Sequence, residues 1–333
     1  MSTRRTGAGG PYDGRVSVEP TQAELEAAFC WEAVDLLPGR PTTTAFRRRV
    51  RLHQARWRAA QGHPMGTEPI RPRPGLDGRP VGSRLPLDYA QATGAQFLTA
   101  GTLAAARARL STPEPHQSFD HQRTWADLLW APAMAFNLFG DLADDLALAT
   151  RALHAWVPDA PGSVVDVRFA HSPGRLDPQW LNSLRAFDAA FVLERGDGTH
   201  GIVGVDVEYH DWLKPETPKP ENLWRTLEVA ERSGAFAAGA TDIVRRTSPL
   251  CLIWLEHLLL LSMLQHPGGE WTWGRYLVVH PAGNDDVAAG LERYHGLLDD
   301  PTTFSTITLE ALLDSNALPE PTTRALRERY LPG

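Results

Sequence analysis

The stretch 187–210, FDAAFVLERGDGTHGIVGVDVEYH, decides the fold of this chain. Two runs of alternating residues flank Asp197-Gly198, a dipeptide typical of the tight turn in a β-hairpin. The pattern therefore predicts two antiparallel strands. With Glu194 and His200 as the last facing pair, the numbers of facing residues always sum to 394.

This register sorts the hairpin into two faces of different chemistry. Asp188 lies opposite Asp206 on the polar face, Glu208 follows two residues on, and Gly204 leaves space there for a backbone or a ligand. A register shifted by one residue would move Asp206 onto the apolar face, which is energetically expensive. The apolar face is expected to pack against helices, and its facing pairs are Phe187–Val207, Ala189–Val205 and Phe191–Val203.

The two opposed carboxylates require compensation, because like charges directly opposite one another destabilise a sheet. A hard divalent cation is the natural candidate, since Mg²⁺ needs only one or two carboxylates together with waters and substrate phosphates. Two other interpretations remain open for Asp188 and Asp206. Both side chains can simply be solvated on an exposed strand face, or the pair can share one proton.

Asp188, followed after the turn by Asp206-Val207-Glu208, resembles the D…(D/E)-x-K signature of the PD-(D/E)xK nuclease superfamily. The resemblance extends from about residue 47 to about residue 313. Over that length the chain is similar to a group of bacterial, restriction-endonuclease-like proteins. The segments that carry the resemblance are RLHQARWR (51–58), MAFNLFG (134–140), FDAA (187–190), GVDVEYH (204–210) and YLVVHPAGN (276–284).

The resemblance implies an α/β (α+β) protein with a restriction-endonuclease-like core. In such a fold a small mixed β-sheet is flanked by helices, here with an N-terminal helical extension. It also implies a metal-dependent endonuclease that hydrolyses DNA phosphodiester bonds, with restriction or defence as its setting. Asp188 and Asp206 would hold Mg²⁺ or Mn²⁺, and a metal-activated water would attack the phosphate.

Glu208 departs from the pattern, which has lysine at this position. Three interpretations follow. Glu208 can be a third metal ligand or the general base. Lys214, or an arginine from the basic segments, can supply the missing cation. Or the protein is catalytically degenerate and binds DNA or a protein partner without cleavage. Glu256 is a second acidic residue at a position where the resemblance implies a basic one.

Charge is distributed unevenly along the 333 residues. The net charge is −7, yet residues 1–110 contain 16 arginines and no lysine against 9 acidic residues. The helix predicted over 46–61 is the most basic part. This N-terminal portion can face a polyanion such as DNA, or it is a solvated, arginine-rich surface.

The compartment is predicted from cysteines and hydropathy. Cys30 and Cys251 show neither disulfide nor metal-ligand spacing, which fits a reducing cytoplasm. No secretory signal is visible at the N-terminus. The apolar run 250–264 is broken by Glu256 and His257 and is too short to span a bilayer, so no membrane association is expected. The oligomeric state stays open, a homodimer included.

The chain divides into three predicted regions: a disordered 1–20, a helical, arginine-rich 21–142 and a nuclease-like core over 143–333. The last two regions either are separate or form one compact unit. Besides the hairpin, strands are predicted over 163–171 and 274–281, and 62–85 is predicted as a long irregular connection. Helices are predicted over 21–37, 46–61, 87–110 (one or two), 125–142, 144–156, 178–185, 220–238, 247–265, 285–298, 309–313 and 321–330.

Histidines and tryptophans are the remaining candidates for binding. The histidines have no metal-ligand spacing and are interpreted as surface residues; they are His53, His63, His116, His121 and His171. Four tryptophans fall on predicted amphipathic helices, which indicates core positions, with base stacking as the alternative for one or two of them. These are Trp31, Trp57, Trp125 and Trp130.

Overall fold

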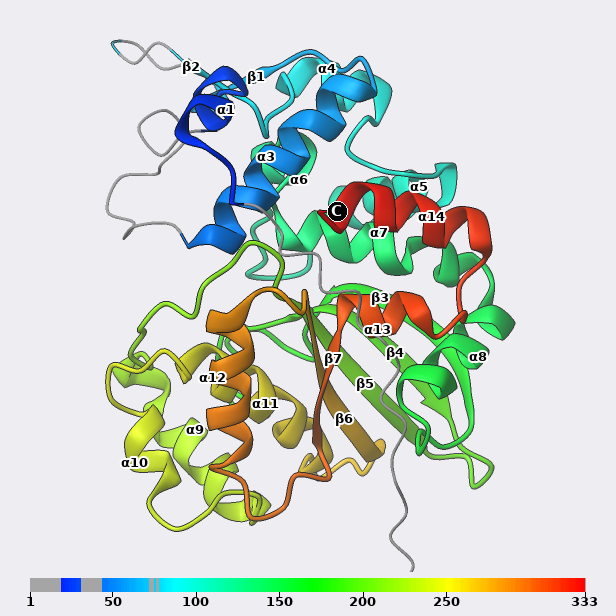
Figure 1. Cartoon of the computed structure of the whole chain (residues 1–333). Helices are drawn as coiled ribbons and strands as arrows, with labels where there is room; N and C mark the ends of the chain where they lie inside the picture. The colour runs from blue at the N-terminus through cyan, green and yellow to red at the C-terminus, as the bar shows by residue number, and fades with distance from the viewer. Residues whose placement is uncertain (1–18, 31–43, 72–74, 76–77, 333) are drawn as a thin grey trace, which may run out of the picture.

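A five-stranded mixed sheet forms the centre of the protein in the computed structural model, which describes residues 19–30, 44–71, 75 and 78–332 (Figure 1). The strand order is β3-β4-β5-β6-β7. The pairs β3–β4 and β4–β5 are antiparallel, whereas β5–β6 and β6–β7 are parallel. The predicted small mixed sheet is therefore confirmed. The bounds are β3 Ser163–His171, β4 Phe187–Glu194, β5 His200–Val207, β6 Trp271–His280 and β7 Phe304–Thr308.

Helices cover both faces of this sheet (Figure 1). One face packs on α7 (Ala131–Asp144), α8 (Leu146–Trp156) and α13 (Leu309–Asp314). The opposite face packs on α11 (Cys251–Leu264), with α9 (Pro220–Ser233) behind it. Because both faces are buried, even the face that carries the acidic residues is largely apolar.

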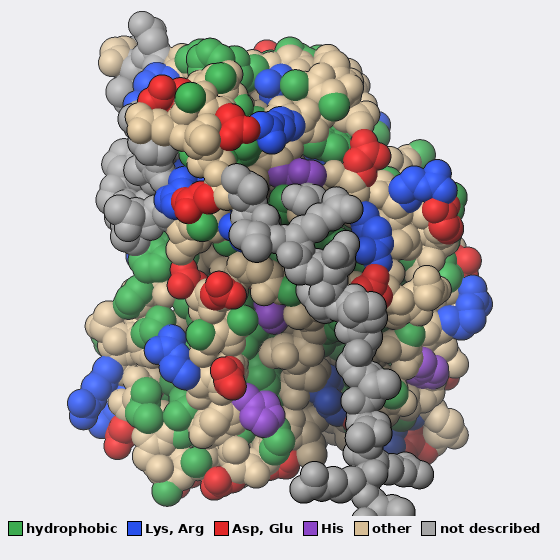
Figure 2. Space-filling model, in the orientation of Figure 1, with side chains coloured by type: hydrophobic (Ala, Val, Ile, Leu, Met, Phe, Trp, Pro, Cys, Tyr) green, Lys and Arg blue, Asp and Glu red, His purple; other side chains and the backbone are tan. Residues whose placement is uncertain are grey.

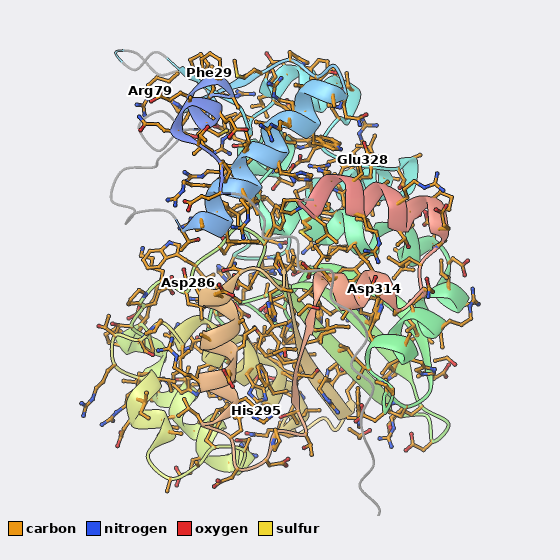
Figure 3. All side chains as sticks on the ribbon, viewed as in Figure 1. Phe29, Arg79, Asp286, His295, Asp314 and Glu328 are labelled. Atoms are coloured by element: carbon orange, nitrogen blue, oxygen red, sulfur yellow. The ribbon has the colours of Figure 1, made fainter. Side chains whose placement is uncertain are left out.

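The remaining helices complete the two layers. On the α11 side these are α10 (Ala240–Val244) and α12 (Asp285–His295). Acidic residues occupy the first turn of α12 and basic residues its last, which complements the helix dipole; Figure 3 shows Asp286 and His295 at its two ends. The N-terminal helices are α1 Gln22–Ala27, α3 Ala45–Ala60, α4 Leu87–Thr93, α5 Ala100–Ser111 and α6 His121–Ala126.

The C-terminal helix α14 (Glu320–Tyr330) packs beside α3 from the N-terminal part, and Figure 3 labels Glu328 at this contact. Gln54 donates to the carbonyl of Arg329 at 2.6 Å and to the hydroxyl of Tyr209 at 2.8 Å. The Arg329 side chain is fully buried and lies over the Trp57 ring, 4.4 Å from its centroid. The two ends of the described chain are thus joined through buried polar contacts.

Several sequence predictions need correction. The helix predicted over 178–185 is wrong, because Asp177 accepts from the backbone N–H of Gln179 and this segment forms turns. The helix predicted over 125–142 is broken: α6 ends at Ala126, and α7 begins at Ala131, where proline stands in the first turn.

Small strands account for other differences. The 62–85 connection contains a two-stranded hairpin, β1 (Gly66–Glu68) with β2 (Arg79–Val81). The short edge strand β7 was not predicted. Of the predicted helix 21–37, the structure shows α1, whereas residues 31–37 lie outside the described residues, as does 1–18 of the disordered stretch.

The prediction that the histidines lie at the surface is wrong for His171, which is buried at the end of β3. Burial, together with the charges of Arg168, Arg175 and Arg109, lowers its pKa to about 3. Trp57 and Trp125 are core residues, whereas Trp130 is half-buried and Trp31 lies outside the described residues. Within the described ranges, no helix is both long and apolar enough to cross a membrane.

Candidate functional site

Asp188 and Asp206 meet at the open end of the β4–β5 hairpin. The ladder runs from Glu194↔His200 to Ala189↔Val205 and then ends, which confirms the predicted register. Beyond that point each carboxylate accepts a backbone N–H of the other strand. The N–H of Asp188 donates to Asp206 Oδ1 at 3.2 Å, and the N–H of Val207 donates to Asp188 Oδ2 at 3.0 Å. Side chains thus satisfy amides that the ladder leaves free.

One predicted neighbour is on the other face. Phe187 was expected opposite Val207 on the apolar face with Ala189, but its ring belongs to the core on the Asp206 face. A Cβ at Gly204 would lie 2.6 Å from this ring. The space predicted above Gly204 for a ligand is therefore filled by Phe187.

Tyr276 holds the second oxygen of Asp206. Its hydroxyl, on the neighbouring strand β6, donates to Asp206 Oδ2 at 2.8 Å. Asp206 is only 9% exposed. Burial, followed by the negative charges of Asp206 and Glu256, raises the pKa of Tyr276 well above its ordinary value, so the hydroxyl stays a donor. Asp206 is therefore held in one orientation by partners on two strands.

The negative charges of the acidic residues repel one another. Burial raises the pKa of Asp206 to about 6, although the Tyr276 hydroxyl, the Asp188 amide and Arg185 act in the other direction. Burial first, and then the charge of Asp206, raises the pKa of Asp188 well above its usual range. These carboxylates are destabilised as anions, which a bound cation would relieve.

Glu208 lies one residue beyond the end of β5 and is half-buried. Its backbone N–H donates to the carbonyl of Val279 at 2.8 Å, which fixes the main chain there. Burial and then the charges of Asp211, Asp206 and Asp188 raise the pKa of Glu208 well above its ordinary value. Glu208 thus belongs electrostatically to the same acidic group.

Arg185 is the basic residue beside these acids, and no motif in the sequence pointed to it. It lies three residues before Asp188, and its guanidinium is 3.0 Å from Glu216 and 3.7 Å from Glu256. Burial alone would lower the pKa of Arg185, but the charges of Glu256 and Glu216 raise it. Asp188 borders a cavity in the surface, and Arg185 is one of the residues that line it. Lys214, in contrast, is exposed and does not line this cavity.

Glu256 approaches the acid pair from α11. It is 5% exposed, and its Oε2 has no hydrogen-bond partner among the described residues. Burial, followed by the charge of Asp206, raises the pKa of Glu256 well above its ordinary value, while Arg185 counteracts the shift. Sequence reasoning noted Glu256 from the resemblance alone; it could not place the residue at this site, because α11 is distant along the chain.

The donor set fits a hard divalent cation. All the side chains involved offer carboxylate oxygens, the ligands that Mg²⁺ and Mn²⁺ prefer. Among the described residues, no three His, Cys, Asp or Glu side chains are grouped closely enough to enclose a metal ion. The arrangement therefore fits an ion held by two carboxylates, with waters and phosphate oxygens as its other ligands, rather than an all-protein cage.

The arginines of α3 do not form an open basic stripe. Arg47 and Arg51 are buried. Arg56 pairs with Glu24 at 2.8 Å, and Arg48 pairs with Glu19. Figure 2 shows acidic and basic side chains interspersed on the face in view. The described part of α3 therefore offers less charge to a polyanion than its sequence indicated.

The five-stranded mixed sheet flanked by helices is consistent with a restriction-endonuclease-like fold. The chain belongs to the PD-(D/E)XK nuclease superfamily, because the family model of that superfamily matches residues 41–332. Members of this superfamily are generally nucleases and typically use divalent metals. No curated protein and no solved structure matches the chain.

Proposed function

We propose that the protein is a divalent-metal-dependent endonuclease that hydrolyses DNA phosphodiester bonds, with Mg²⁺ or Mn²⁺ held by Asp188 and Asp206. The observation that carries the proposal is the meeting of these two carboxylates, Asp206 buried and Asp188 half-buried, at the end of the β4–β5 ladder. Such an arrangement costs folding free energy, because two like charges are desolvated side by side. A cation site explains why this cost is retained.

A bound metal ion would polarise the phosphate and supply a water of lowered pKa. The residues of the chain perform the other tasks. Tyr276 and the Asp188 amide orient Asp206. Glu208, next to the pair, is the candidate third ligand or general base. Arg185 is better placed than the exposed Lys214 to offset negative charge that develops on the phosphate.

The proposal is tested by plasmid cleavage in Mg²⁺, Mn²⁺ and EDTA. We expect nicking or linearisation only with metal. Asp188→Asn and Asp206→Asn should lower the rate about a hundredfold or more, since a lost metal ligand removes several kcal/mol of stabilisation, at about 1.4 kcal/mol per factor of ten. Asn keeps an acceptor for the Val207 amide, so the fold is preserved. Glu194→Gln, at the other end of β4, is the matched control.

A second candidate is the catalytically degenerate form, and Glu208 in the lysine position is the observation that favours it. That form predicts salt-sensitive DNA binding with no cleavage in either metal. Cleavage that persists in both Asp188→Ala and Asp206→Ala would refute the metal-site proposal. Absence of binding to DNA at low salt would refute the degenerate DNA-binding form.

A further inference from the structure

A hollow of about 370 Å³ opens beside Asp188 of the acid pair. Asp188 and Glu256 line one side of it. The lining also includes the loop 116–120 and the start of α7, with Trp130 and Pro132. The volume lies at the lower end of the range for small-molecule sites, and it suits a single nucleotide rather than a length of duplex.

Two aromatic residues contribute to the lining of the hollow. Trp130 and Phe119 both line it, and both are half-buried. The guanidinium of Arg123 lies 3.8 Å from the centroid of the Trp130 ring, and Arg123 is itself held by Asp127 at 3.2 Å. Trp130 is thus fixed by an anchored cation, as a stacking platform requires.

Polar groups stand where the remaining parts of a nucleotide would lie. Arg175 and Arg185 line the hollow and bring guanidinium groups to it, Arg175 paired with Glu114 and Arg185 with Glu216. Glu256 lines the same hollow, and its buried Oε2 has no hydrogen-bond partner within the part of the chain that the structure describes. A carboxylate oxygen in such a position accepts from the exocyclic amine of a base. The lining therefore offers a stacking face, a phosphate contact and an acceptor.

A fully paired duplex does not match these features. Binding to a duplex relies mainly on basic side chains that contact phosphates along the helix. In the described part of α3, Arg47 and Arg51 are buried, and Arg56 pairs with Glu24. A base inside a duplex could also not reach Trp130 without leaving its stack.

We propose that this hollow binds one unpaired nucleotide, with its base against Trp130 and its phosphate toward Asp188 and Arg185. The substrate class is then DNA with an unpaired nucleotide at the cleavage point: a single strand, an overhang or an extruded base. This inference rests on the proposed nuclease function, which it narrows. It also assigns base stacking to Trp130, for which the sequence left core packing and base stacking open.

Binding is measured by fluorescence anisotropy in EDTA, with a labelled single-stranded 12-nucleotide oligodeoxycytidine, whose bases carry an exocyclic amine, and a 12-base-pair duplex. The wild type should bind the single strand about tenfold more tightly than the duplex. Trp130→Ala should weaken single-strand binding about tenfold, since stacking contributes about 1–3 kcal/mol per base, and should leave duplex binding unchanged. Trp130→Phe should retain most of the affinity. Trp224→Ala, at a 56% exposed tryptophan outside the hollow, is the matched control.

The outcomes separate this inference from the nuclease proposal. Equal affinity for single strand and duplex, or single-strand binding that Trp130→Ala does not change, overturns the nucleotide pocket. If Trp130 supports single-strand binding but no DNA is cleaved in Mg²⁺ or Mn²⁺, the pocket stands and the nuclease proposal fails. If a fully paired duplex is cleaved as fast by Trp130→Ala as by the wild type, the nuclease stands and the pocket fails. Thermal unfolding of each variant checks that it is folded.

Discussion

The two ends of the β4–β5 hairpin carry the same residue type in opposite environments. At the turn, Asp197 is exposed and accepts from the hydroxyl and the N–H of Thr199, which lowers its pKa. At the open end, burial and the charge of Asp206 raise the pKa of Asp188. Hydrogen bonds from Thr199 at the exposed turn stabilise the carboxylate of Asp197, whereas desolvation destabilises the carboxylate of Asp188. The turn end serves the fold, and the open end bears the features of a binding site.

The largest expected difference between the two ends is in metal binding. Divalent metal at a hundredfold excess over its dissociation constant should raise the free energy of unfolding of the wild type by about 2.7 kcal/mol. Asp188→Asn should lose this gain, and Asp197→Asn should keep it. Thermal unfolding with and without Mg²⁺ measures both. An equal metal effect in the wild type and in Asp188→Asn would contradict a site at the open end.

Two glycines in β5 and the turn extend the comparison to packing. Gly204→Ala should destabilise the fold by about 2 kcal/mol, because its Cβ meets the Phe187 ring at 2.6 Å. Gly198→Ala should cost about 1 kcal/mol through the backbone φ of 78° alone, since no atom of the described residues lies within 4 Å of the added Cβ. Adding Phe187→Leu should restore stability partly to the first variant and not to the second. Urea denaturation measures the stability of the two single variants and the two double variants. If Phe187→Leu restored stability to both glycine variants, this account would be refuted.

Tyr276 tests the orientation of Asp206. Tyr276→Phe removes the hydroxyl that donates to Asp206 Oδ2 and should destabilise the protein by about 1.5 kcal/mol, because it leaves a buried acceptor unsatisfied. The same variant should lower the cleavage rate by loosening a metal ligand. Thr199→Val at the exposed turn should change stability less and leave cleavage unchanged. A larger effect at Thr199 would reverse the comparison.

The smallest expected effect is the titration of Asp197. Its folded pKa lies below the unfolded value, so its hydrogen bonds stabilise the protein above the unfolded pKa and are lost as the pH falls through the folded one. Carboxyl NMR shifts should show Asp197 titrating below the ordinary value for aspartate. Thr199→Val should return it toward that value; a pKa unchanged by this substitution would exclude Thr199 as the cause.

The sequence predicted the part of the site that lies within the hairpin, but it missed residues that reach the acids from elsewhere in the fold. The Asp197-Gly198 turn and the alternation of apolar residues specify the hairpin register, so Asp188 and Asp206 were placed together correctly. The side of Phe187 was not predictable, because alternation no longer constrains a strand once its ladder ends. Tyr276 and Arg185 were missed because they reach the acids by tertiary packing, which no spacing within the hairpin encodes.

The same distinction explains the differences in secondary structure. The long periodic segment α3 was predicted to within one residue at each end, whereas α11 begins at Cys251 rather than at the predicted residue 247. The strand β7 has five residues and follows a polar connection, so its pattern was too short to recognise. The segment 178–185 begins with a proline that favours a helix start, yet Asp177 uses its side chain and carbonyl to hold a turn instead. Local side-chain hydrogen bonds decided that segment.

The distance along the chain between the acid pair and its cover has a kinetic consequence. Asp188 and Asp206 are 18 residues apart, whereas Asp206 and Tyr276 are 70 residues apart. Short loops close at lower entropic cost than long ones, so we expect the hairpin to form first, with its carboxylates still hydrated. Dehydration then comes when β6 and α11 dock. A cation that relieves the repulsion should therefore slow unfolding more than it accelerates folding, which stopped-flow measurements with and without Mg²⁺ would show.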